Sequence, residues 1–258
     1  MIGMETITRK SLIYKSGLGF YCLNHVQGCS HGCRYPCYAF SMARHYGRAA
    51  GYKEWRRPKL VTNALELLDK ELPKLRAKAA AGPGAEEFRV HLCLTTDPFM
   101  VGWPEIQSLS LRIIEKINAG GLACDVLTKG VLPPALAGPA FSRKNHYGIS
   151  LISLNESFRQ RWEPGAAPYA DRIRALRYLH DQGFPTYAHI EPYPTPNIVR
   201  QDFGALLEAV AFVDSIYFGG WNYSPLARKY PDRAGFYAEM ATKVKSFCHH
   251  HGINCEME

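Results

Sequence analysis

Two hydrophobic patterns alternate along the chain. Short apolar runs rich in β-branched residues recur, and between them lie longer stretches with an apolar residue every three or four positions. The short runs predict strands at 19–26, 88–94, 123–128, 147–152, 185–191 and 214–219. The longer stretches predict helices at 38–48, 61–75, 104–118, 167–182, 202–212 and 233–250, and a short helical turn near 134.

Two segments interrupt this rhythm. Pro73 falls inside the second predicted helix, and we expect it to end or kink that helix. The stretch 79–86 is rich in alanine, glycine and proline, and it predicts a solvated loop rather than a linker between domains, because a strand follows at once.

Regular alternation of strands and helices predicts a parallel sheet joined by right-handed crossovers and covered by helices. Six such units are too few to close an eight-stranded barrel, so we expect an α/β fold of the partly open (β/α)6 barrel kind. Ligands of such sheets lie at the carboxyl ends of the strands. We expect one domain over 1–258, with a core at about 18–225 and a C-terminal helix and tail at 226–258.

Composition narrows the class further. The chain has 258 residues, of which 47% are hydrophobic and 21% charged, and this excludes disorder, collagen and a coiled coil. The formal net charge of +8 suits an anionic substrate but identifies no partner. No run of 18 apolar residues occurs, and no apolar stretch follows the first lysines, so we expect a cytoplasmic protein without a membrane span.

Three of the eight cysteines, Cys29, Cys33 and Cys37, lie within nine residues, whereas the other five are dispersed. Thiolates this close repel one another unless a metal centre neutralises them, and sulfur ligands select zinc or an iron–sulfur cluster. Zinc would need a fourth ligand, and three nearby residues could supply it: Cys22, His25 or His31. No second Cys-x-x-Cys pair follows, so the pattern favours an iron–sulfur cluster, with zinc as the alternative.

Several motifs occur together in a characteristic order and spacing. They are Gly-Cys-Ser-His-Gly-Cys-Arg-Tyr-Pro-Cys-Tyr-Ala at 28–39, Leu-Thr-Thr-Asp-Pro-Phe at 94–99, Leu-Thr-Lys-Gly at 127–130, Gly-Ile-Ser-Leu at 148–151, Trp-Glu-Pro-Gly at 162–165, Asp-Arg at 171–172 and Ile-Glu-Pro-Tyr-Pro at 190–194. Over roughly 18–225 the chain resembles the radical S-adenosylmethionine (SAM, AdoMet) superfamily. Within it, the chain is most similar to the spore photoproduct lyase-like branch, also called DNA repair photolyase-like.

The resemblance implies a [4Fe-4S] cluster with Cys29, Cys33 and Cys37 on three irons and S-adenosyl-L-methionine on the fourth. It also implies reductive cleavage of AdoMet, radical chemistry on a polar substrate, and an external one-electron donor of the flavodoxin or ferredoxin type. Further cofactor contacts are implied for seven residues: Tyr35, Tyr38, Thr95, Thr96, Lys129, Ser150 and Glu191. A surface lysine and ordinary strand polarity are the alternatives for Lys129 and for the hydroxyl residues.

The chain departs from the family in its cysteine spacing. Pro36 makes the intervals three and three residues, where the family has three and two, so we expect a longer final loop around the same cluster. The aromatic residue that normally precedes the third cysteine is then Tyr35 or Tyr38.

A second departure concerns the reaction. Spore photoproduct lyase uses a cysteine as hydrogen donor where this chain has Leu94, and Cys93 lies one position earlier. Since side chains alternate across a strand, we expect the Cys93 thiol to turn away from the barrel interior, which makes lesion repair doubtful. Lesion-repair lyase, zinc-binding nucleic-acid module and electron carrier remain alternatives to a radical enzyme acting on another substrate.

Three further features have two interpretations each. Aromatic and polar residues of the fifth and sixth strands either contact substrate or pack in the core: Tyr187, His189, Glu191, Tyr193 and the segment 219–223. The basic and aromatic run 44–59 suits phosphate or nucleic acid but also a solvated helix face.

The tail from Cys248 to Cys255 suggests either a second metal site or a helix ended by Gly252. Glu163 and Arg172 suggest an internal ion pair that shapes a loop.

Overall fold

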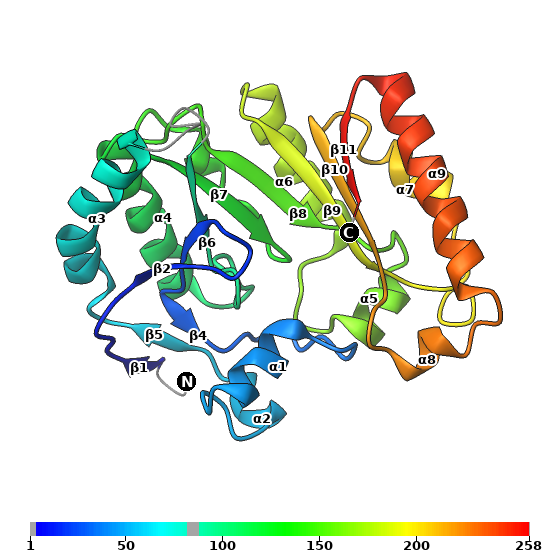
Figure 1. Cartoon of the computed structure of the whole chain (residues 1–258), viewed down its shortest axis with the longest axis horizontal. Helices are drawn as coiled ribbons and strands as arrows, with labels where there is room; N and C mark the ends of the chain where they lie inside the picture. Colours follow the sequence, from blue (N-terminus) through cyan, green and yellow to red (C-terminus); the bar gives the residue numbers. More distant parts are fainter. Residues whose placement is uncertain (1–3, 82–87, 258) are drawn as a thin grey trace.

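The computed structural model describes residues 4–81 and 88–257, and its centre is a curved eight-stranded sheet (Figure 1). The strand order is β11-β10-β9-β8-β7-β6-β3-β2. All neighbouring pairs are parallel except β2 and β3. The strands are β2 (Ile13–Lys15), β3 (Tyr21–Leu23), β6 (Arg89–Leu92), β7 (Ala123–Thr128), β8 (His146–Ser150), β9 (Thr186–Tyr193), β10 (Ser215–Gly220) and β11 (Asn254–Met257).

Within the described residues β2 and β11 are the two edges, so the sheet does not close. The predicted partial barrel is confirmed.

Helices connect the strands of the sheet (Figure 1). They are α1 (Tyr38–His45), α2 (Tyr52–Trp55), α3 (Ala64–Ala81), α4 (Pro104–Ala119), the 3-10 turn η2 (Pro134–Ala137), α5 (Glu156–Trp162), α6 (Tyr169–Asp181), α7 (Phe203–Glu208), α8 (Pro225–Arg228) and α9 (Arg233–His251). Of these, α3, α4, α6, α7 and α9 pack in the main core against the outer face of the sheet. No helix in the described part of the chain is long and apolar enough to cross a membrane.

The alternation of side chains on β7 shows how the two faces of the sheet differ. Cys124 and Val126 are fully buried in the main core, which they share with Ile113 and Ile117 of α4. Asp125 and Leu127 point to the opposite, inner face and are only half-buried. Successive side chains of a strand point to opposite faces of the sheet. Cys124 and Val126 therefore face the helices, and polar side chains can lie on the inner face.

A second sheet of three short strands lies beside the first, with the order β1 (Glu5–Ile7), β5 (Lys59–Val61) and β4 (Val26–Gln27). None of these was predicted as a separate strand, because two or three residues are too few to display a period. β4 follows directly on β3 and leads into the cysteine loop, so this sheet sets where that loop begins.

The predicted strands and long helices are present, β2 was not predicted, and three further differences occur. Helix α3 continues through Pro73 to Ala81, so the expected end at Pro73 was wrong. The predicted loop at 79–86 begins inside this helix, and 82–87 lie outside the described residues. Gly252 ends α9 in the left-handed region (φ +67°), which confirms the cap, but β11 then adds a seventh parallel strand that was not predicted.

Candidate active site

The cysteine loop, residues 28–37, joins β4 to α1 and makes two tight turns at glycines. Gly28 has φ +92°, and a Cβ there would lie 2.7 Å from the carbonyl oxygen of Trp55. Gly32 has φ +66°, and its Cβ would meet the Arg56 side chain at 2.9 Å. Both positions therefore require glycine. Within this loop the three free, half-buried thiols are Cys29, Cys33 and Cys37.

Burial makes two of these thiols, Cys29 and Cys33, poor thiolates on their own. Burial, and then the negative charge of Asp97, raises the pKa of the Cys29 thiol well above its ordinary value. Burial, and then Glu163, raises the pKa of Cys33 to about 12. A positive centre is therefore needed to hold them ionised, as a metal cluster does.

The candidate fourth ligands for zinc are occupied elsewhere. The Cys22 thiol donates to the Tyr14 carbonyl oxygen at 3.7 Å, and His25 Nε2 lies 2.7 Å from Ser110 Oγ. In residues 4–81 and 88–257, no three His, Cys, Asp or Glu side chains are grouped to bind one metal ion. This holds for the three loop cysteines and for the tail at Cys248 alike. Three loop sulfurs without a fourth protein ligand fit a cluster that keeps one iron open better than they fit tetrahedral zinc.

His31, between the first two cysteines, fastens the loop to the sheet. Its Nε2 lies 2.9 Å from Asp97 Oδ2, and its Nδ1 lies 3.2 Å from the Gly165 carbonyl oxygen. Asp97 also accepts from the Thr128 hydroxyl at 2.7 Å and from the Lys129 amide at 2.8 Å. Burial alone would raise the pKa of Asp97, but His31 and these donors hold it below its ordinary value. The carboxylate thus links the loop to the ends of β6 and β7.

Glu163, fully buried, is the centre of a second network. Its carboxylate accepts from the Tyr35 hydroxyl at 2.7 Å and from Arg172 Nη2 at 3.1 Å, and Lys129 Nζ lies 3.8 Å away. Burial opposes the charge, but Arg172, Lys129 and Tyr35 keep the pKa of Glu163 below its ordinary value. The predicted Glu163 and Arg172 ion pair is confirmed.

The two candidate aromatic residues of the loop have different surroundings. Tyr35 is buried and its ring meets Trp221 edge-on at 5.2 Å. Tyr38 is the first residue of α1, is 58% exposed, and its hydroxyl donates to the Leu94 carbonyl oxygen. Only Tyr38 therefore has a ring open to a ligand on its outer side.

The other residues predicted to contact the cofactor lie at or just beyond carboxyl ends of parallel strands. Beyond β6, the Thr95 amide donates to Asn24 Oδ1 at 3.1 Å and the Thr96 hydroxyl donates to the Gly28 carbonyl oxygen. Lys129 follows β7, Ser150 ends β8, and Glu191 lies near the end of β9. A Cβ on Gly219 of β10 would lie 2.7 Å from the Glu191 carboxyl carbon, so glycine there leaves room for that side chain.

Cys93 is not part of a strand, although the sequence predicted a strand through this position. It follows β6 in the left-handed region (φ +58°) and lies outside the strand, so strand alternation does not decide its direction. The thiol is buried and lies 3.5 Å from His25 Nδ1. Burial, and then Asp97, raises its pKa well above the ordinary value.

A cluster that the sequence did not reveal lies on the inner face of the sheet. Register places His91 of β6 opposite Asp125 of β7, and Asp125 opposite His146 of β8. Asp125 accepts from the Tyr187 hydroxyl at 2.7 Å, and His146 Nδ1 lies 3.1 Å from it. His189 stacks on Tyr217 beside them at 5.9 Å.

Tyr187 and His189 therefore lie on the inner face, where Tyr187 is buried and His189 is half-buried. Tyr193, 2% exposed, packs in the core against Phe203, as one of the two interpretations predicted.

The fold and the site thus combine a partly open α/β barrel with a three-thiol loop beyond its first parallel strand. The family model described as "Radical SAM superfamily" matches residues 23–210. The chain therefore belongs to the radical SAM superfamily and is an enzyme, and the family implies AdoMet and an iron–sulfur cluster.

Individual relatives are distant. "Uncharacterized protein ORF301" of Acidianus two-tailed virus is 25% identical over 196 residues, which are 74% of this chain and 61% of the viral protein. The chain thus spans less than two thirds of that relative.

Two solved structures share the fold. Spore photoproduct lyase complexed with dinucleoside spore photoproduct has a TM-score of 0.68 and 16% identity, covering 98% of this chain and 80% of that one. A mutant of that lyase with bound AdoMet and the same dinucleoside has a TM-score of 0.65 and 15% identity, covering 97% and 80%.

Proposed function

We propose that this enzyme holds a [4Fe-4S] cluster on Cys29, Cys33 and Cys37 and binds AdoMet at the remaining iron. The observation that carries the proposal is the donor set: three half-buried thiols lie on one loop that turns at glycines, and Cys22, His25 and His31 are engaged elsewhere. When bound, the two groups supply one-electron cleavage of a carbon–sulfur bond and so a 5′-deoxyadenosyl radical.

Lys129 and Glu191 would orient AdoMet. The Lys129 backbone is held at both ends, because its amide donates to Asp97 and its carbonyl oxygen accepts from the Ala167 amide at 2.9 Å. Its side chain is 17% exposed, and its ammonium group suits the carboxylate of the methionine moiety. Glu191 suits the amino group. We assign lesser polar contacts to Thr95, Thr96 and Ser150.

An apolar wall beside the loop would exclude water. Tyr35, Phe158 and Trp221 are buried together, and Cys33 packs against this group. Trp162 meets Trp221 edge-on at 5.1 Å. Because radicals react with whatever is near, a dry wall next to the cofactor protects the reaction. Tyr38, on the open side of α1, is our candidate for contact with the adenine.

The substrate would enter the inner face of the sheet, where Asp125, Tyr187 and His189 offer polar and aromatic contacts to an organic molecule. A separate flavodoxin- or ferredoxin-type protein would supply the electron. We further propose that 1–258 forms one domain and acts in the cytoplasm.

Lesion repair on DNA is the second candidate, because the neighbour structures contain a dinucleoside lesion. The buried contact of Cys93 with His25 disfavours this thiol as a hydrogen donor to substrate. Cys93→Ala should therefore leave turnover intact, and a loss of turnover with cluster and AdoMet binding preserved would favour repair.

The test is anaerobic purification with iron and sulfide counting, followed by dithionite and AdoMet and a search for 5′-deoxyadenosine. We expect about four irons per chain and 5′-deoxyadenosine. Cys33→Ala should abolish both, while Cys22→Ala is the matched control. Zinc without iron would refute the proposal. Methylthioadenosine in place of 5′-deoxyadenosine would show that a different carbon–sulfur bond breaks, and would indicate aminocarboxypropyl transfer instead.

A further inference from the structure

A small cavity of about 240 Å³ lies beside the cysteine loop and is lined by several cations. Arg9, Lys15 and Arg48 contribute to its lining, and among residues 4–81 and 88–257 no carboxylate lines it. Gly28, which precedes the first cysteine, and Thr95 belong to the same wall. The cavity therefore borders the cofactor site and concentrates positive charge there.

These cations are not neutralised within the described part of the chain, where no ion pair involves Arg9, Lys15 or Arg48. Burial, and then the charge of Arg48, lowers the pKa of Arg9 from its ordinary value. Two guanidinium groups that oppose each other's charge are stabilised when an anion binds to both.

The backbone holds Arg9 firmly in place. Its amide donates to Asn63 Oδ1 at 3.0 Å, and its carbonyl oxygen accepts from Asn63 Nδ2 at 2.8 Å. The Arg48 guanidinium lies 5.5 Å from the centre of the Tyr46 ring, a cation–π distance. The charges of this cavity are thus partly preorganised.

An unsatisfied hydroxyl lies in the same wall. Ser16 lines the cavity, and its Oγ is shielded from solvent without a hydrogen-bond partner in the described residues. Buried polar atoms are nearly always paired, so this lone hydroxyl, on a residue that lines the cavity, is free to donate to an acceptor. A phosphate oxygen accepts from both a hydroxyl and guanidinium groups.

Exposed aromatic and sulfur-containing side chains surround the cations. Tyr14, Met42 and Tyr46 line the cavity and are 36%, 42% and 59% exposed. Rings placed this way stack on planar bases. The volume is below the roughly 300–1,000 Å³ of sites for drug-sized ligands, so the cavity suits one nucleotide-sized group.

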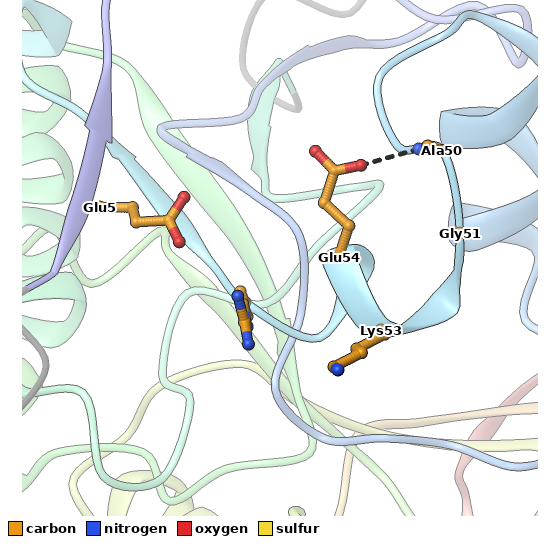
Figure 2. A pocket seen from close by; sticks show the side chains of 6 residues that line it. Glu5, Ala50, Gly51, Lys53 and Glu54 are labelled. Carbon is orange, nitrogen blue, oxygen red and sulfur yellow. Dashed lines mark hydrogen bonds between the residues drawn. The ribbon is translucent and has the colours of Figure 1, made fainter.

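The larger hollow nearby provides a contrast. It measures about 620 Å³, lies between β1 and α2, and is lined by Glu5 and Glu54 as well as Lys53 and Arg57 (Figure 2). Glu54 lies 3.1 Å from Lys59 and accepts from the Ala50 amide at 2.8 Å. Mixed charges give this hollow no preference for an anion.

We propose that the cavity formed by Arg9, Ser16 and Arg48 binds a nucleotide phosphate, which anchors the substrate beside the cysteine loop. That the bound group belongs to the substrate rests on the proposed function, whereas the binding itself does not. The phosphate comes either from a free mononucleotide or from a nucleic-acid strand.

The experiment titrates the anaerobically purified holoenzyme, without AdoMet, with cytidine 5′-monophosphate, with cytidine and with a hexamer of deoxycytidine. We expect the monophosphate or the hexamer to bind and cytidine not to bind. Arg48→Ala should lower the affinity for the probe that binds by about 10-fold or more, because a charge-assisted hydrogen bond is lost. Ser16→Ala and Arg9→Lys should weaken it less.

Arg44→Ala is the matched control, since Arg44 is an exposed arginine on α1 that does not line the cavity. Binding of the monophosphate supports a mononucleotide, and Arg48-dependent binding of the hexamer alone supports a strand. The proposal is overturned if neither probe depends on Arg48, or if Arg44→Ala weakens binding as much as Arg48→Ala.

The two proposals fail separately. Arg48-dependent binding in a protein that forms no 5′-deoxyadenosine would refute the proposed function and leave the phosphate site in place. Formation of 5′-deoxyadenosine without Arg48-dependent binding would refute only the phosphate site.

Discussion

His31 Nε2 lies 2.9 Å from Asp97 Oδ2, and this contact joins the cysteine loop to the segment beyond β6. The loop residue Gly165 adds a second fastening, because its amide donates to the His31 carbonyl oxygen at 2.8 Å. A Cβ on Gly165 would lie 2.3 Å from the Ser30 carbonyl oxygen, so the two loops are in direct backbone contact. The position of the three thiols thus depends on residues far away in the sequence.

His31→Gln should loosen the cluster without unfolding the protein. Loss of an outer-shell partner typically costs about 10-fold in metal affinity, so we expect faster loss of iron to a chelator and an unchanged circular dichroism spectrum. His45→Gln, on the exposed side of α1, is the control. Equal iron release from both variants would contradict a positioning role for His31.

Glu163→Gln should destabilise the fold. The substitution leaves Arg172 and Lys129 facing a neutral amide in a buried site, and breaking a buried ion pair costs about 3–5 kcal/mol. Glu66→Gln removes an exposed partner of Lys70 and should cost no more than about 0.5 kcal/mol. Urea unfolding measures both, and similar losses for the two variants would be inconsistent with the network described.

Stability should fall in acid. The folded-state pKa values of Asp97, Asp125 and Glu163 lie below their ordinary values, although burial alone would raise them. Their stabilisation is fully present above the unfolded pKa of about 4, and it is lost as pH falls through the folded values. Urea unfolding between pH 7 and pH 3 measures this effect.

Asp125→Asn tests how much the protonation of Asp125 contributes to this loss of stability in acid. It should be less stable than the parent at pH 7 and lose less further stability on acidification. A slope as steep as that of the parent would show that Asp125 contributes nothing to the pH dependence.

Gly148→Ala should be harmful because of Tyr187. A Cβ at Gly148 would lie 2.3 Å from the Tyr187 ring, which the Asp125 contact holds in place. Overpacking of this kind costs about 1–3 kcal/mol. A Cβ at Gly17 meets nothing within 4 Å, so Gly17→Ala is the control and should be nearly neutral. Equal stability of the two variants by urea unfolding would mean that the inner face is loosely packed.

Much of the fold could be predicted because most of the parallel strands coincide with apolar runs between amphipathic helices. β11 was not predicted because its sequence, Asn-Cys-Glu-Met, contains no apolar run. Its hydrogen-bonded pairing with β10 holds it as a strand. The continuation of α3 through Pro73 reflects packing of Leu72 and Leu75 in the core, which outweighs the local preference of proline.

The sequence predicted those parts of the candidate site whose residues are close together in the chain. The three cysteines are close in sequence, so their spacing alone indicated a metal centre. Asp125 meets His91 and His146 only through the register of three strands. The direction of the Cys93 side chain could not be predicted from strand alternation, because Cys93 lies just beyond β6 and has a left-handed backbone conformation.

The three loop thiols and the group they hold determine which reaction this enzyme performs. The most direct measurement is iron, sulfide and 5′-deoxyadenosine in one anaerobic preparation of the wild-type chain and of Cys29→Ala. The account predicts about four irons and four sulfides per chain, with 5′-deoxyadenosine formed from AdoMet after reduction, and loss of all three signals in the variant. A colourless wild-type protein that contains zinc and forms no 5′-deoxyadenosine would contradict it.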